Sequence, residues 1–233
     1  MNQGVDSQEP ILALLGDPAT HDGHAVKRID THAASVFLAG ERAFKVKRAV
    51  RFPFLDFSTL EKRKSACEAE IEVNRAFAPA IYRRVVAITR QADGSLALGG
   101  RGTPVEWAVE MRRFDETLTL DHLAGPGRID AALADMLGRT VATAHATAAA
   151  VAPEPWIDAM GAYIAEHVAE FGRTPDLFPA ADVAALARAS RAVYARIRPL
   201  LVERGRRGLV RRIHGDLHLG NICLLYTSDA ADE

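Results

Sequence analysis

The sequence predicts an α+β protein with two lobes of different composition. Residues 25–114 carry short runs of alternating apolar and polar side chains separated by turns, which is typical of antiparallel strands. Residues 117–203 carry helical periodicity instead. The pattern changes near Arg112–Asp115. A cleft between two lobes is a common place for a ligand site, so we expect functional residues near this junction.

The N-terminal part predicts a short helix followed by an antiparallel meander. Residues 9–16 (EPILALLG) form an amphipathic stretch that ends in glycine, which predicts a helix. Three strands are then expected, near residues 25–30, 34–39 and 42–49. The second and third strands are joined by a turn at Gly40-Glu41.

The rest of the first lobe predicts a helix and three further strands. Residues 51–57 (RFPFLDF) are interpreted as an aromatic loop. Ser58 begins a capping-box pattern with Glu61, so a helix is expected to run from there to about Ala76. Two strands flank a turn at Asp93-Gly94, and residues 105–114 form a more apolar, buried strand.

The second lobe predicts helices and then a return to extended chain. The expected helices cover residues 118–123, 129–150, 156–172 and 180–203. The segment GLVRRI, which precedes His214, is interpreted as a strand, and the loop HGDLHLGN follows it.

Composition indicates an ordinary soluble globular protein. The chain has 233 residues, 48% of them hydrophobic, and a formal net charge of -1. Neither a nucleic-acid nor a membrane partner is expected from that charge. With only two cysteines, no signal-peptide pattern and no long apolar run, we expect a cytoplasmic protein.

The loop HGDLHLGN carries the strongest chemical signal. Asp216 precedes Asn221 by five residues, the spacing of a kinase catalytic loop, in which a carboxylate accepts a hydroxyl proton and an amide oxygen holds magnesium. Two other readings are open. The two residues could cap a turn, or His214, Asp216 and His218 could ligate a metal as in a phosphoesterase.

A lysine strand and a glutamate helix favour the kinase reading. Lys45 and Lys47 lie on one face of the strand RAFKVK because side chains alternate. Kinases pair a strand lysine with a helix glutamate, which fixes the ammonium against the phosphates. Glu70 is the predicted partner, because Val73 and Phe77 supply an adjoining apolar face. Lys47 is an alternative to Lys45 as the active lysine.

Taken in order, these motifs resemble the aminoglycoside phosphotransferase-like group of the protein-kinase-like fold. The resemblance spans about residues 24–222. More narrowly, the chain is similar to a bacterial subgroup of uncharacterised relatives. It implies that Asp216 is the catalytic carboxylate, that His214 braces the loop, and that Asn221 binds Mg2+. Lys45 would bind the phosphates of ATP or GTP with Glu70 as its partner.

The resemblance also implies a nucleotide-binding hinge and a phosphate-covering turn. The hinge would be Glu110-Met111-Arg112, whose backbone would meet the purine. The turn Thr31–Ser35 lacks the glycine-rich pattern of kinases, so the cradling of phosphate would rely on Thr31 and Ser35.

Four segments are expected from this reading. They are an N-terminal extension (1–23), a strand-rich N-lobe (24–114), a helical C-lobe truncated after the catalytic loop (115–222) and a non-native tail (223–233). The tail resembles a translated sequencing adapter. Its Asp229 and Asp232 lack the apolar strand expected around a second magnesium-binding aspartate. Some relatives in the subgroup carry a C-terminal P-loop kinase domain, so the full-length protein is expected to be longer.

The expected function of the parent protein is transfer of a nucleotide γ-phosphate to a hydroxyl of a small molecule. The fragment as written is expected to be inactive, because a metal ligand and part of the C-lobe are missing. Two alternatives are a nucleotide-binding regulatory module without turnover and a metal-dependent phosphoester hydrolase.

Overall fold

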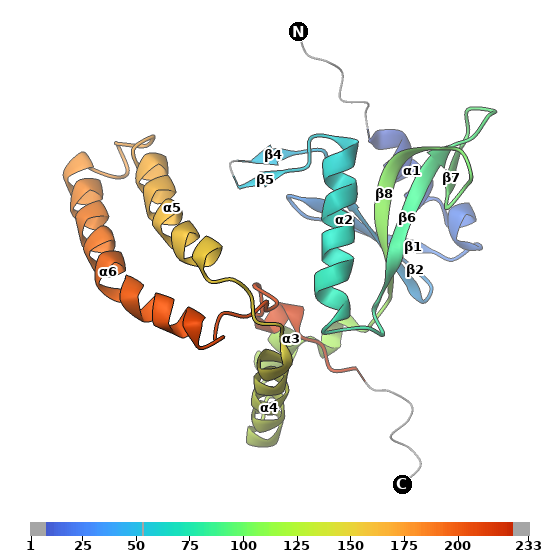
Figure 1. Cartoon of the computed structure of the whole chain (residues 1–233). Helices are drawn as coiled ribbons and strands as arrows, with labels where there is room; N and C mark the ends of the chain where they lie inside the picture. The colour runs from blue at the N-terminus through green and yellow to red at the C-terminus, as the bar shows by residue number, and fades with distance from the viewer. Residues whose placement is uncertain (1–7, 53, 226–233) are drawn as a thin grey trace. The chain divides into compact units, whose positions relative to one another are not determined.

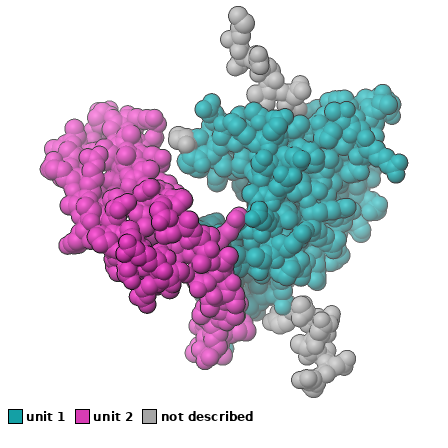
Figure 2. All heavy atoms as spheres, in the orientation of Figure 1, with its two compact units in different colours: residues 1–130, 214–233 teal, residues 131–213 magenta. Residues whose placement is uncertain are grey.

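The computed structural model of the chain describes residues 8–52 and 54–225. The chain divides into two compact units, one formed by residues 1–130 with 214–233 and the other by residues 131–213 (Figure 2). The predicted α+β composition is confirmed, since the first unit is built around a sheet and the second is helical.

The first unit is built on a six-stranded antiparallel sheet in the order β1-β2-β3-β8-β6-β7. Gly40 and Gly94 have positive φ angles, 54° and 85°, at the two turns predicted for them. The strands are β1 (Val26–Asp30), β2 (Ala34–Ala39), β3 (Arg42–Lys47), β6 (Tyr82–Arg90), β7 (Leu96–Leu98) and β8 (Thr103–Arg112).

One face of the sheet is covered by the N-terminal helix. Helix α1 (Glu9–Gly16) packs Ile11 and Leu15 among the buried side chains of Phe44 and Val46. A 3-10 turn (Pro18–His21) follows it. Helix α1 is therefore part of the core of this unit.

The other face is covered by α2 (Leu60–Arg75), which lies along β8 and β6 (Figure 1). Cys67 and Ile71 of the helix pack in a cluster with Val109 and Met111. Cys67 is fully buried there, and burial raises the pKa of its thiol to about 12. Lys45 pairs with Val109 in register, so it shares this face with α2.

The segment that precedes α2 differs from the prediction in two respects. The expected aromatic loop contains a short hairpin, β4 (Arg51–Phe52) with β5 (Leu55–Asp56). The predicted capping box at Ser58 is wrong, because the Ser58 hydroxyl donates to Asp56 Oδ1 at 2.6 Å. Thr59 has the extended backbone of an N-cap, and its hydroxyl accepts from the Lys62 amide.

The segment after β8 and the segment after His214 meet within the same unit. A 3-10 turn (Glu116–Leu118) and α3 (Leu120–Ala124) follow β8, and a third 3-10 turn covers Leu219–Asn221. The Leu120 amide donates to the Ile222 carbonyl at 2.9 Å, and the Leu224 amide donates to the Leu118 carbonyl at 3.0 Å.

The second unit consists of α4 (Ala131–Thr147), α5 (Glu154–Phe171) and α6 (Ala180–Arg206). Helices α5 and α6 lie side by side as a hairpin (Figure 1). The Tyr194 hydroxyl of α6 donates to the Ile157 carbonyl of α5 at 2.7 Å. The four predicted helical stretches of the C-terminal half are confirmed with shifted ends.

The strand predicted just before His214 is wrong. Residues 208–213 contain an isolated bridge from Arg211 to Ala150, and the Val151 amide donates to the Val210 carbonyl. A ladder needs a neighbouring strand, and the backbone of this segment bonds instead to the short connection between α4 and α5 and to the end of α6. Among the described residues, no helix is both long and apolar enough to cross a membrane.

Candidate active site

The strand lysines and the helix glutamate form a buried charge centre. Glu70 Oε1 accepts from Lys45 Nζ at 2.9 Å, and Glu70 Oε2 accepts from Lys47 Nζ. Both ammonium groups reach the same carboxylate because residues two apart on β3 point to the same face, beneath α2. Sequence reasoning selected Glu70 as the partner of the strand lysine, and the structure brings it to both candidate lysines.

The charge state of Glu70 follows from this arrangement. Burial raises the pKa of the carboxyl, but the two lysines outweigh burial through their charge and hydrogen bonds, so the pKa lies below its ordinary value. The centre then contains two ammonium groups and one carboxylate. It keeps a net positive charge, which suits an anionic ligand such as phosphate.

The predicted catalytic loop is closed by its own asparagine. The Asn221 side-chain amide donates to the Asp216 carbonyl at 2.9 Å and to Asp216 Oδ2 at 3.0 Å. The Asp216 side chain is 76% exposed, and His218 Nε2 lies 3.8 Å from its Oδ2. Asp216 and Asn221 therefore lie together, with the carboxylate open to a ligand.

His214 attaches this loop to α2. Its Nε2 lies 3.2 Å from Asn74 Oδ1, and its Nδ1 accepts from the Asp216 amide at 3.3 Å. Phe77 contacts the imidazole edge-on, with the ring centroids 5.5 Å apart. Both ring nitrogens are thus engaged within the protein, which agrees with a bracing role and disfavours metal ligation by His214.

Two residues predicted to bind nucleotide lie on the opposite face of the sheet from Lys45. Ser35 pairs with Val46, is buried, and donates to Asp30 Oδ1 at 2.6 Å. Glu110 pairs with Phe44. The structure does not bring either side chain to the lysine centre.

The carboxylate of Glu110 is held by arginines instead. It accepts from Arg42 Nε at 3.1 Å and from Arg84 Nε at 2.8 Å. Burial raises the pKa of this carboxyl, but the two guanidinium groups outweigh burial, so the pKa lies below its ordinary value. A side chain committed in this way has a structural role in the sheet.

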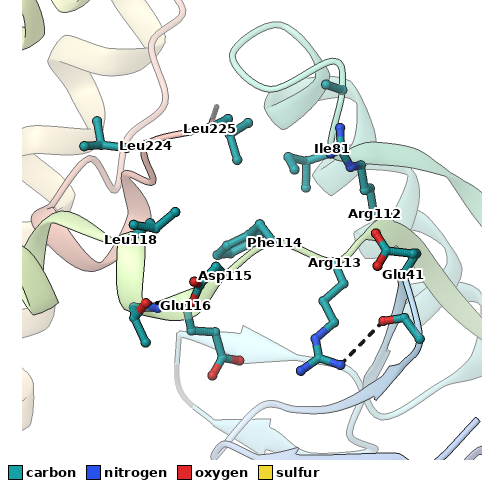
Figure 3. Close-up of a pocket in the computed structure, with 13 residues that line it drawn as sticks. Glu41, Ile81, Arg112, Arg113, Phe114, Asp115, Glu116, Leu118, Leu224 and Leu225 are labelled. Atoms are coloured by element: carbon teal, nitrogen blue, oxygen red, sulfur yellow. Dashed lines mark hydrogen bonds between the residues drawn. The ribbon is translucent and has the colours of Figure 1, made fainter. Parts of the chain in front are cut away.

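The remaining hinge residues lie at the end of β8. Met111 is buried on the face that carries α2, and the Arg112 amide donates to the Ile81 carbonyl at 2.8 Å. A cavity of about 570 Å³ lies beside this segment, with Arg112, Arg113 and Phe114 in its wall (Figure 3). Leu224 and Leu225 also line it.

The donor set fits magnesium through oxygen atoms. The Asp216 carboxylate and the Asn221 amide oxygen are the hard ligands that Mg2+ takes, together with substrate phosphates and water. Among residues 8–52 and 54–225, no three His, Cys, Asp or Glu side chains are grouped to hold a metal ion. The two aspartates considered as a further ligand, Asp229 and Asp232, lie outside the described residues.

Asn74 is the functional candidate that sequence reasoning missed. It lies one helical turn after Glu70, and its amide donates to the Glu70 carbonyl at 2.8 Å. The i,i+4 spacing from Glu70 was a signal that could have drawn attention to it. Its contact with His214 joins residues 140 positions apart, which no local pattern indicates.

Comparison with known proteins agrees with this geometry. Similar curated proteins include uncharacterized proteins of Mycobacterium bovis and Mycobacterium tuberculosis, each 36% identical over 116 residues, which is 50% of this chain and 22% of the relative. The chain thus matches under a quarter of the length of these relatives. No solved structure matches the chain. The profile of the phosphotransferase enzyme family (APH) matches residues 35–230, and the chain therefore belongs to this family, whose fold is protein-kinase-like.

Proposed function

We propose that the protein to which this chain belongs transfers the γ-phosphate of ATP or GTP to a hydroxyl group of a small molecule. The observation that carries the proposal is the Glu70 carboxylate held between Lys45 and Lys47, on the helix that also contacts the Asp216 loop. Family membership supports phosphotransfer in general. The residues described above support the more specific reaction.

In this proposal Lys45 is the phosphate-binding lysine. The Lys45 side chain is 30% exposed and the Lys47 side chain 10%, so the Lys45 ammonium group is the more accessible of the two to a nucleotide. Lys47 is enclosed by Glu70 and the ring of Phe57, with Nζ 5.5 Å from the ring centroid. Its role is to hold Glu70 from the buried side.

Asp216 and Asn221 would carry out the transfer. The acceptor oxygen forms a bond to the γ-phosphorus while the bond from that phosphorus to the β,γ-bridging oxygen breaks, and the nucleoside diphosphate leaves. The acceptor proton passes to a carboxylate oxygen of Asp216. Asn221 would contribute an amide oxygen to Mg2+, which neutralises charge on the phosphates when bound.

The lysine assignment is tested with matched variants. Lys45→Ala is expected to lower kcat/KM for the nucleotide about 100-fold, because it removes a charge that stabilises the transferring phosphoryl group. Lys47→Ala is expected to lower the free energy of unfolding more than Lys45→Ala does, because the Lys47 side chain is more deeply buried than the Lys45 side chain.

The role of the carboxylate is tested by Asp216→Asn. This variant is expected to retain nucleotide binding and to lose about 100-fold or more in kcat.

The measurements are nucleotide-induced thermal shifts with and without Mg2+, and nucleoside diphosphate release against a panel of hydroxyl acceptors. Nucleotide binding without release of nucleoside diphosphate in the presence of any acceptor would instead support a regulatory module. Release of phosphate from esters without nucleotide would support a hydrolase. A larger loss of turnover in Lys47→Ala than in Lys45→Ala would contradict the lysine assignment.

A further inference from the structure

Asn74 occupies a position between the charge centre and the catalytic loop. Its side-chain nitrogen donates to the Glu70 carbonyl at 2.8 Å, and its side-chain oxygen lies 3.2 Å from His214 Nε2. Asn74 and Glu70 are four residues apart and therefore lie on the same face of α2. The side chain is half-buried between the helix and the loop.

The orientation of the Asn74 amide determines the tautomer of His214. The Glu70 carbonyl can only accept a hydrogen bond, so the atom of Asn74 that faces it must be the nitrogen. The oxygen of Asn74 then faces His214 and can only accept. His214 Nε2 must therefore carry the proton, and a neutral ring has Nδ1 free to accept the Asp216 amide, which lies 3.3 Å away.

The packing around His214 holds the ring in this orientation. Phe77, three residues after Asn74, meets the imidazole edge-on at an interplanar angle of 81°. Asn74 of α2 thus contacts the ring by a hydrogen bond, and Phe77, in the turn that follows α2, contacts it by an aromatic edge. The Asp216 backbone is attached to the same ring, so the position of the loop depends on the position of α2.

We propose that Asn74 is a positioning residue that holds His214 in the Nε2–H tautomer and thereby places Asp216 relative to the Lys45–Glu70 centre. Helix α2 then positions two parts of the site. Glu70 holds the Lys45 ammonium group, and Asn74 holds the loop that carries the Asp216 carboxylate. The catalytic consequence rests on the proposed function. The tautomer and the attachment of the loop do not depend on it.

The structural part is tested by 15N NMR of the histidine rings and by amide exchange at pH 8. In the wild type, His214 is expected to show the Nε2–H pattern. Asn74→Leu is expected to mix the two tautomers and to speed exchange of the Asp216 amide about tenfold, the loss expected for one hydrogen-bonded link. Asn74→Asp keeps an acceptor oxygen and is expected to restore the Nε2–H pattern. An Nε2–H pattern and Asp216 exchange that are both unchanged in Asn74→Leu would overturn the proposal.

A matched control separates this effect from a general change in the helix. Ser65→Leu places the same side chain on the exposed face of α2 and is expected to change neither readout. Exchange of the β8 amides reports whether each variant is folded. If Asn74→Leu does not fold, Asn74→Asp decides the question, because loss of the Nε2–H pattern in that folded variant would contradict the role of the oxygen.

The catalytic part is tested by a double-mutant cycle of Asn74→Leu and His214→Ala. Asn74→Leu is expected to lower kcat about tenfold and to leave the KM for nucleotide nearly unchanged, because Asn74 contacts the loop and not the phosphates. The double variant should be no worse than His214→Ala alone, since the two residues act through one contact. Effects that multiply would overturn the coupling. Absence of phosphate transfer in the wild type would count against the proposed function, and the tautomer measurement would still decide the role of Asn74.

Discussion

Glu70 accepts hydrogen bonds from two ammonium groups while its own side chain is only 10% exposed. A carboxylate with this little access to water is stable in its charged form only when cations compensate for the lost hydration. Lys45 and Lys47 provide that compensation from one side of β3. The same arrangement leaves one positive charge in excess, which is the basis for the proposed phosphate site.

The depressed pKa of Glu70 predicts how stability depends on pH. Because the folded-state pKa lies below the ordinary value of 4.5, the ionised group stabilises the fold above that value. This contribution is lost as the pH falls through the folded-state pKa. We expect Glu70→Gln to lower the free energy of unfolding at pH 7 by about 1.5–3 kcal/mol, the range for hydrogen bonds to charged groups. The difference from wild type should shrink below about pH 4.5.

Urea unfolding between pH 3 and pH 7 measures this difference. Glu68→Gln is the control, because Glu68 forms an exposed pair with Lys64 on the same helix. A difference between wild type and Glu70→Gln that stays constant over the whole pH range would show that Glu70 does not contribute through its charge.

At the scale of elements, the N-terminal extension is tied to the sheet and to α2 by a polar network. Gln8 donates to Glu106 Oε2 at 2.7 Å and to the Lys47 carbonyl at 3.0 Å. Arg63 Nε of α2 lies 2.9 Å from both oxygens of Glu106, which is fully buried. The helix that carries Glu70 and Gln8 are therefore joined at one carboxylate of β8, and Gln8 also bonds the backbone of the strand that carries the lysines.

Removing the cation from this network is expected to be costly. Among the residues that the structure describes, Arg63→Met leaves the buried Glu106 carboxylate with Gln8 as its one side-chain partner, so we expect a loss of about 3–5 kcal/mol in the free energy of unfolding. Lys64→Met, one position along the helix, removes an exposed charge and should cost about 1 kcal/mol or less. Chemical denaturation of both variants measures the contrast. Equal losses would show that Arg63 matters only as a helix residue.

At the scale of the whole molecule, the two units differ in how much apolar surface they bury. The sheet unit has two clusters of buried side chains, one on each face of the sheet. Among the described residues of the helical unit, the buried apolar side chains are Ile157, Ala187 and Leu201. Fewer buried contacts imply lower local stability.

Hydrogen exchange should resolve this difference along the chain. We expect amides in α4, α5 and α6 to exchange about tenfold faster or more than amides in β2, β3 and β8, because local opening of the helices exposes little apolar surface. Exchange followed by mass spectrometry of peptides from the two units measures the rates. Equal protection in the helices and in the central strands would contradict this expectation.

Local patterns were sufficient to place the candidate site residues on their elements. The alternation of RAFKVK placed Lys45 and Lys47 on one face, and the helical periodicity after Thr59 selected Glu70. The spacing of Asp216 and Asn221 predicted a loop in which the two lie together. These predictions depend on backbone geometry that repeats every two or every 3.6 residues, and such repeats are visible in a single sequence.

Only the tertiary structure decided which distant groups meet. The register of β2 against β3 turned Ser35 away from Lys45, and the same alternation turned Glu110 toward Arg42. The contact of His214 with Asn74 depends on the packing of α2 against a loop 140 residues away. Contacts of this kind are set by the burial of whole elements against one another, so no repeat within the sequence records them.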